Sequence, residues 1–226
     1  MAEENRSLDV VTLITAGRDR EAAQRGAGLV DTTRTPDPPA GGTMEPLAQF
    51  EALGGSLMPV IAGLDPSQLD APTPCADFTV RGVLEHMIGG GTMFTAAYRG
   101  EEPPEPDFSD PIGGAQRMLG GLAEAITAPG ALDRTIQAPF GEVDGVSFAR
   151  FVVLDGLVHG WDMAVATGQP YEPSDELVAA VQAFAEQALD PLRDGQTFGA
   201  AIEPAAGSTP IERLAAYTGR RPLVTT

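Results

Sequence analysis

The 226-residue sequence contains no lysine, two histidines and a single cysteine. All 14 basic residues are arginine, a bias that we attribute to a GC-rich genome. The lone Cys75 excludes an internal disulfide framework and fits a reducing cytoplasm. No apolar run reaches the roughly 18 residues needed to cross a bilayer, and the acidic start MAEENRS is unlike a basic secretory signal. We therefore expect a cytoplasmic protein that does not insert into a membrane.

Positive charge and aromatic residues are also scarce. The formal net charge is −18, and residues 44–226 carry most of it, with 25 acidic residues against 9 arginines. Such a surface repels nucleic acids and anionic membranes. Aromatic residues make up 6% of the chain, too few for a platform on which bases stack. The glycine pairs lack the spacing of a phosphate-binding loop. The expected partner is therefore a small-molecule substrate.

The chain divides at about residue 43. Residues 32–43, TTRTPDPPAGGT, have the composition of a linker. We therefore expect residues 1–43 to form a poorly ordered extension, with a helix that covers the site or packs on a partner as the alternative. Residues 44–222 form the predicted domain.

Helical periodicity recurs through this domain, and little sequence alternates between apolar and polar residues. We therefore predict an all-α bundle. The predicted helices cover residues 43–64, 79–98, 115–126 and 148–168, one that starts at Ser174, and a short one at 209–219. Residues 131–146 are irregular or form a short hairpin.

The predicted helix 148–168 carries an unusual polar row. Its core stripe consists of Phe151, Leu154, Val158, Trp161 and Val165. The neighbouring row is apolar at both ends but contains Asp155, His159 and Asp162 in its middle. A carboxylate and an imidazole four residues apart are thus placed on the inner side of one helix, where polar groups need a partner.

The second histidine, His86, lies on a mostly apolar row of the predicted helix 79–98. Gly89, Gly90 and Gly91 follow it, and each glycine costs a helix about 1 kcal/mol relative to alanine. Glycines one turn from an inward-facing imidazole leave open volume beside the ring. We therefore expect Gly89, Gly90 and Met93 to line a cavity next to His86.

Two interpretations of these residues stay open. The histidines are either ordinary core residues satisfied by hydrogen bonds, or they bind a metal ion together with Asp155. In the second case His86, Asp155 and His159 supply two imidazoles and one carboxylate and leave positions for water and substrate, as in catalytic metal sites. Asp162 then either hydrogen-bonds the His159 ring from outside the ligand set or lies on the surface. Cys75, in a turn, fits a structural role better than that of a nucleophile.

Three segments resemble a known family: TPCADFTVRGVLEHMIGGG, VLDGLVHGWDMAVATGQP and IERLAAYTGRRP. They are similar to actinobacterial uncharacterised proteins related to the metal-binding domain of mycothiol-dependent maleylpyruvate isomerase, within the DinB/YfiT-like metalloenzymes. The resemblance covers about Met44 to Pro222. It implies a DinB-like four-helix bundle with an additional short C-terminal helix and a divalent ion, expected to be zinc. It places the metal ligands at His86, Asp155 and His159.

The sequence departs from the isomerase at two points. The isomerase has glutamate where this chain has Asp155, and its separate C-terminal domain has no counterpart here. With these differences, the resemblance implies a thiol-dependent isomerase or S-transferase, with mycothiol as the thiol and a small electrophile as substrate. The alternatives are a metal-dependent hydrolase or biosynthetic cyclase that uses no thiol, and a non-catalytic bundle that binds a small molecule or a partner. The sequence leaves open whether the protein forms a homodimer.

Overall fold

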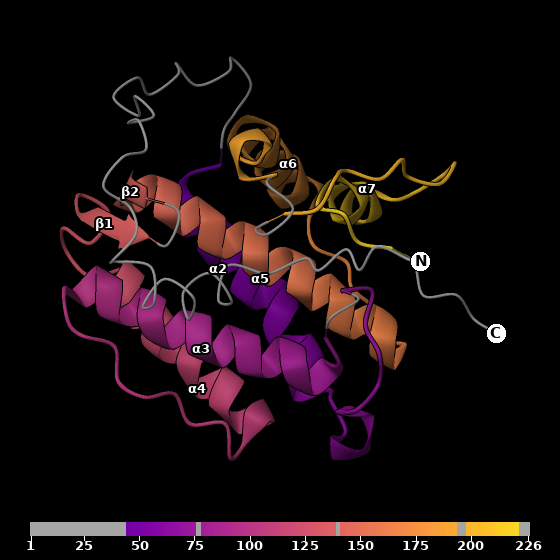
Figure 1. Ribbon diagram of the computed structural model, residues 1–226, viewed down its shortest axis with the longest axis horizontal. Helices are drawn as coiled ribbons and strands as arrows, with labels where there is room; N and C mark the ends of the chain where they lie inside the picture. The colour runs from indigo at the N-terminus through magenta and orange to yellow at the C-terminus, as the bar shows by residue number, and fades with distance from the viewer. Residues whose placement is uncertain (1–43, 76–77, 139–140, 194–197, 222–226) are drawn as a thin grey trace, which may run out of the picture.

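The computed structural model describes residues 44–75, 78–138, 141–193 and 198–221, so the predicted extension 1–43 lies outside the described residues. Within these ranges the protein consists of six α-helices, two short 3₁₀ turns and one two-stranded sheet (Figure 1). The chain is thus mostly helical, as predicted. The small sheet corrects the all-α expectation at residues 131–146, where a hairpin had been one of two readings.

Four helices pack around a common core. Their bounds are α2 (Pro46–Ala62), α3 (Val80–Arg99), α4 (Pro111–Ile126) and α5 (Gly145–Thr167). α3 lies alongside α4, and α2 lies alongside α5. The core is filled mainly by leucine, valine and isoleucine from all four helices, such as Leu57, Leu84, Leu122 and Leu157. Burial of these apolar side chains is what holds the bundle together.

The central helix is α5, and its burial differs from the prediction. We expected an amphipathic helix with one apolar stripe, but α5 is covered by α2, α3, α6 and α7 and by the hairpin. Val165 of the predicted stripe is exposed, while Phe151 is only half-buried and packs edge-on against Phe184 of α6. Asp162, on the polar row, is fully buried. When a helix is covered on several sides, its pattern of apolar residues does not indicate which face carries the site.

Local capping residues set the helix ends close to the predicted bounds. The Thr79 hydroxyl accepts a hydrogen bond from the Gly82 N–H and starts α3. Thr209 and Glu212 form a capping box at the start of α7 (Pro210–Tyr217). Gly168 ends α5 with a φ of 68°, a left-handed conformation that favours glycine.

The hairpin joins α4 to α5. Strands β1 (Thr135–Ala138) and β2 (Gly141–Asp144) pair antiparallel, with Thr135 opposite Asp144. Asp144 then caps α5 by accepting a hydrogen bond from the Ser147 N–H at 2.8 Å. The hairpin therefore fixes where α5 begins, and with it the register of the polar row.

Two helices rather than one lie outside the group of four. α6 (Asp175–Ala188) and α7 both pack on α5. α7 is the short C-terminal helix that was expected, and the segment that follows it returns to α5. No helix in the described ranges is both long and apolar enough to cross a membrane.

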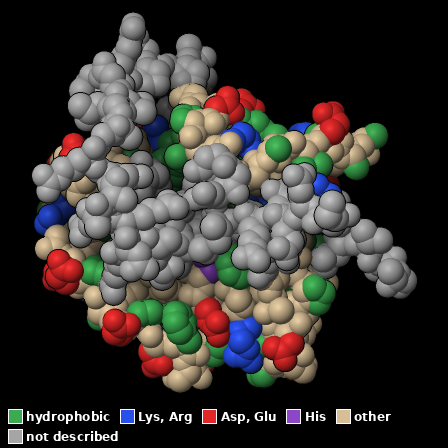
Figure 2. Space-filling model, viewed as in Figure 1, with side chains coloured by type: hydrophobic (Ala, Val, Ile, Leu, Met, Phe, Trp, Pro, Cys, Tyr) green, Lys and Arg blue, Asp and Glu red, His purple; other side chains and the backbone are tan. Residues whose placement is uncertain are grey.

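The surface of the described part is acidic in the way the composition predicts. Figure 2 shows acidic side chains spread over the visible face, with arginines scattered between them. Both histidines are buried.

Candidate metal centre

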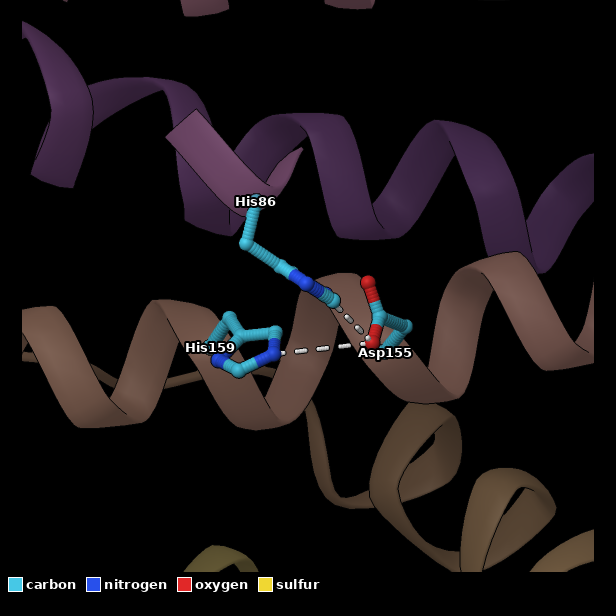
Figure 3. Close-up of side chains that lie close together, drawn as sticks. All are labelled: His86, Asp155 and His159. Carbon is cyan, nitrogen blue, oxygen red and sulfur yellow. Dashed lines mark hydrogen bonds and ion pairs between the residues drawn. The ribbon is translucent and has the colours of Figure 1, made fainter. Parts of the chain in front are cut away.

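His86, Asp155 and His159 meet inside the bundle. Each offers one ligand atom, and these atoms lie within 4.8 Å of one another. The Nε2 atoms of both histidines face the same carboxylate oxygen, Asp155 Oδ1, at 3.4 Å from His86 and 3.5 Å from His159 (Figure 3). The ring centroids of the histidines are 4.7 Å apart. Residues separated by 69 positions in the chain thus converge on one point.

Secondary structure explains this convergence. Asp155 and His159 are one helical turn apart on α5, so their side chains lie on the same face. His86 comes from α3, which runs antiparallel to α5, since Phe94 and Tyr98 further along α3 contact Phe148 near the start of α5. The two helices therefore face each other along the polar row.

The site is deeply buried on the histidine side. The side chains of His86 and His159 are 3% and 0% exposed, whereas that of Asp155 is 20% exposed. Burial opposes ionisation of Asp155, but the nearby charges of His86 and then His159 outweigh it and lower the pKa of the carboxyl from 3.8 to about 2. Asp155 is therefore a carboxylate at neutral pH and can serve as an anionic ligand.

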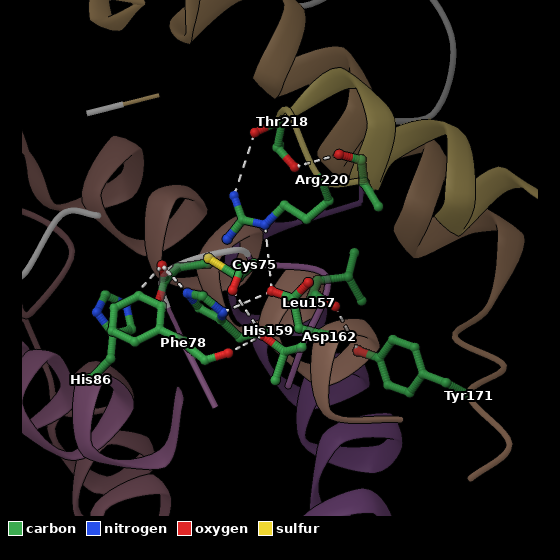
Figure 4. A network of polar contacts seen from close by, with 12 residues as sticks. Cys75, Phe78, His86, Leu157, His159, Asp162, Tyr171, Thr218 and Arg220 are labelled. Atoms are coloured by element: carbon green, nitrogen blue, oxygen red, sulfur yellow. Dashed lines mark hydrogen bonds and ion pairs between the residues drawn. The ribbon is translucent and has the colours of Figure 1, made fainter. Parts of the chain in front are cut away.

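A second polar layer supports His159. Its Nδ1 donates a hydrogen bond to Asp162 Oδ2 at 3.0 Å, and Arg220 Nε lies 3.4 Å from the same oxygen (Figure 4). All three side chains are buried. Asp162 thus takes the first of its two predicted roles. Such outer partners fix the tautomer and the orientation of a ligating imidazole.

Sequence analysis missed Arg220. It lies just beyond α7 and 58 positions from Asp162, so no periodicity connects the two residues. The only available signal was that TGRRP belongs to the third segment of the family resemblance, which says nothing about contact with the site.

Phe78 was missed as well. Its ring centroid lies 5.5 Å from that of His86 and 6.3 Å from that of His159, so it covers both imidazoles from one side. A ring in this position limits the access of water to the histidines. Phe78 precedes the cap of α3, and no pattern around it distinguishes a position against the histidines from one in the core.

The donor set, two imidazoles and one carboxylate, fits a divalent transition-metal ion. The two nitrogen–oxygen distances are 3.4 and 3.5 Å, and all three ligand atoms lie within 4.8 Å of one another, so one ion could contact all three side chains after small adjustments. Imidazole and carboxylate are also the donors that zinc accepts.

A small apolar cavity adjoins Asp155. It has a volume of about 20 Å³, and its lining includes Met87, Gly91, Met118 and Asp155. Gly89, Gly90 and Met93 do not line this cavity, so their role beside His86 stays a prediction. The space next to Gly91 is filled, because a Cβ there would collide with Met118 Sδ.

Comparison with known proteins places this site within a family. The family model described as mycothiol maleylpyruvate isomerase N-terminal domain matches residues 50–164, a range that includes all three candidate ligands. Uncharacterised proteins from two strains of Mycobacterium tuberculosis are each 31% identical over 181 residues, which is 78% of this chain and 98% of the relative. No solved structure matches the chain significantly. With a model that spans just over half of its residues and relatives matched over nearly their full length, the chain belongs to the mycothiol maleylpyruvate isomerase N-terminal domain family.

Proposed function

We propose that the protein is a DinB-like, zinc-dependent enzyme that activates a thiol for isomerisation of, or transfer to, a small electrophilic substrate. The observation that carries the proposal is the convergence of His86, Asp155 and His159 within 4.8 Å, inside the region matched by the family model. Three protein ligands leave coordination positions open, which is typical of catalytic rather than structural zinc.

Zinc with an open position would bind a thiol as thiolate and so supply a nucleophile at neutral pH. The protein contributes the environment for this chemistry. Nε2 of each histidine and a carboxylate oxygen of Asp155 would hold the ion, while Asp162 keeps the proton of His159 on Nδ1. Phe78 shields the two rings from water on one side.

Mycothiol is the thiol we propose, because the family model takes its name from a mycothiol-dependent enzyme. The net charge of −18 supports a small molecule rather than a nucleic acid or a membrane as the partner. The single buried cysteine, Cys75, supports a reducing cytoplasm as the location.

Metal content is the first test. Protein purified without chelator is expected to contain about one equivalent of zinc by elemental analysis, and chelation is expected to lower the melting temperature. His86→Ala should lose this metal, whereas Glu85→Gln, which changes the neighbouring residue outside the cluster, should keep it. Retention of zinc by His86→Ala would exclude the proposed ligand set.

Thiol chemistry is the second test. With maleylpyruvate the zinc-loaded protein should form the isomerised product only when mycothiol is present, and the thiol should be recovered unchanged. With activated alkenes it should consume mycothiol as the thioether forms, and His159→Ala should abolish both reactions. A protein that binds zinc but whose turnover does not depend on a thiol would instead support a thiol-independent hydrolase or cyclase.

A further inference from the structure

The C-terminal helices contribute to the candidate centre from outside the range that the family model matches. That range is residues 50–164, and α6, α7 and Arg220 lie beyond its end. The two helices pack on each other and on α5, on the side of α5 away from α3 and α4 (Figure 1). Arg220, which follows α7, nevertheless contacts Asp162 inside the protein, with Nε 3.4 Å from Oδ2. The surroundings of the candidate ligand His159 therefore include a residue from the C-terminal part of the chain.

The end of α7 directs Arg220 toward Asp162. Gly219 follows the helix with a φ of 90°, a left-handed conformation that favours glycine, and the Arg220 N–H then donates to the Ala215 carbonyl at 3.0 Å. A Cβ on Gly219 would also lie 3.3 Å from the carbonyl oxygen of Ala200, so this turn has little room for a larger residue. The side chain of Arg220 is 6% exposed and that of Asp162 is fully buried. The turn therefore places a buried guanidinium against a buried carboxylate.

A second arginine fixes the end of α7 to the segment after α6. Arg193 donates from Nη1 to the Gly199 carbonyl at 2.6 Å and from Nη2 to the Tyr217 carbonyl at 2.9 Å. Its guanidinium also lies over the Tyr217 ring, 4.5 Å from the ring centroid. α6, α7 and the segment after α7 are thus held together, and we call them the C-terminal unit (residues 175–193 and 198–220).

One carboxylate connects this unit to the candidate ligand. Asp162 Oδ2 accepts from His159 Nδ1 at 3.0 Å and from Arg220 Nε. If the C-terminal unit separates from α5, Asp162 loses its guanidinium and no longer has a fixed position from which to orient the imidazole. Two equilibria that share a group in this way are linked: the factor by which docking raises metal affinity equals the factor by which metal favours docking.

We propose that docking of the C-terminal unit on α5 and binding of a metal ion at His159 stabilise each other through Asp162, with Arg220 as the positioning residue. This inference rests on the proposed metal-dependent function and adds a regulation of the same site, because a change that releases the unit also releases the ion. Loss of an outer partner of a ligating histidine lowers metal affinity by about 10–100-fold. Metal should therefore reduce the undocked population of the unit by a similar factor.

Hydrogen exchange of the α7 amides, measured with and without zinc, tests the coupling. In wild type, saturating zinc is expected to slow this exchange by about 10–100-fold, because undocking exposes these amides. In Arg220→Gln, also saturated with zinc, the slowing should be lost. Equal slowing in the two proteins, or no slowing in a wild type that binds zinc, would overturn the coupling. A wild type that takes up no zinc would instead refute the proposed function, and the coupling with it.

Two glycine variants test the direction of Arg220 without removing a charge. Gly219→Ala and Gly207→Ala each put a side chain on a left-handed glycine, with φ values of 90° and 84°, so both should cost stability. Gly207 lies before α7, and no atom lies within 4 Å of a Cβ built there. In competition with a chelator, Gly219→Ala should bind zinc at least tenfold more weakly than wild type, whereas Gly207→Ala should bind it as wild type does. Zinc affinities that fall equally in both variants, or in neither, would overturn the role of Arg220.

Discussion

His86 and His159 approach the same carboxylate from two helices, but their surroundings differ. His159, on α5, is fully buried, and its Nδ1 donates to Asp162, which is itself paired with Arg220. His86, on α3, contacts Asp155 through Nε2, and its buried Nδ1 has no hydrogen-bond partner among the described residues. One imidazole is thus held by a chain of polar groups and the other mainly by packing against Phe78.

This difference has a consequence for metal binding. A carboxylate can only accept a hydrogen bond, so Asp162 keeps the proton of His159 on Nδ1 and leaves Nε2 as a metal donor. The hydrogen bond from His86 to Asp155 places the His86 proton on Nε2, the atom that faces the site. His159 is therefore ready to bind an ion, whereas His86 has to move its proton to Nδ1. The α5 half of the site is preorganised, and the α3 half adapts.

The largest expected effect is a loss of stability when the α5 side of the site, where Asp162 holds His159, is changed. Asp162→Ala would leave the buried guanidinium of Arg220 without its carboxylate, and breaking a buried pair in this way costs about 3–5 kcal/mol. Urea denaturation of the metal-free protein measures this loss. Asp70→Ala, which removes a 90% exposed carboxylate from a surface pair with Arg81, should change stability by less than about 1 kcal/mol. Equal losses in the two variants would contradict a structural role for Asp162.

A smaller effect is expected for Arg220→Gln, which acts on His159 through Asp162. Loss of an outer partner of a ligating histidine lowers metal affinity by about 10–100-fold. Competition with a chromophoric chelator gives the affinity. Arg221→Gln changes the adjacent, exposed arginine and should leave zinc binding as in wild type. If both variants bind zinc equally well, Arg220 does not position His159.

Sequence periodicity was sufficient for the parts of this site that lie on one helix. The spacing of Asp155 and His159 predicted a shared face, and helical periodicity over residues 79–98 predicted the start of α3, which begins at Val80. The convergence of His86 with this pair came from the family resemblance and from the burial expected of its row. These features are local, or depend only on which side of a helix faces the core.

The rest depends on packing between distant segments. Arg220 contacts Asp162 from the segment after α7, 58 positions further along the chain, and Phe78 covers the histidines from a turn before α3. The space expected at Gly91 is taken by Met118 of α4, because the volume that a glycine leaves is available to any neighbouring helix. Such contacts are set by how helices pack, which the pattern of a single helix does not contain.

Asp155, which faces both histidines, should make the free energy of unfolding depend on pH. Its pKa is lowered to about 2 in the folded protein, so it binds protons less readily there than in the unfolded chain. The stability that wild type gains over Asp155→Asn is therefore fully present above about pH 4 and is lost as the pH falls through about 2. Urea midpoints of both proteins between pH 2 and 5, with chelator present, measure this change. A difference that stays constant over this range contradicts the lowered pKa.

The smallest expected effect concerns proton positions and leaves stability unchanged. In the metal-free protein at neutral pH, ¹⁵N NMR of the imidazoles should show the His159 proton on Nδ1 and the His86 proton on Nε2. Zinc should leave the His159 tautomer as it is and move the His86 proton to Nδ1, since both Nε2 atoms then bind the ion. Asp162→Asn replaces a carboxylate that can only accept with an amide that can accept or donate, so it should mix the His159 tautomers without affecting those of His86. If both histidines have the same tautomer in the metal-free protein, the two ligands are equally preorganised. The difference between the surroundings of His86 and His159 would then have no role in metal binding.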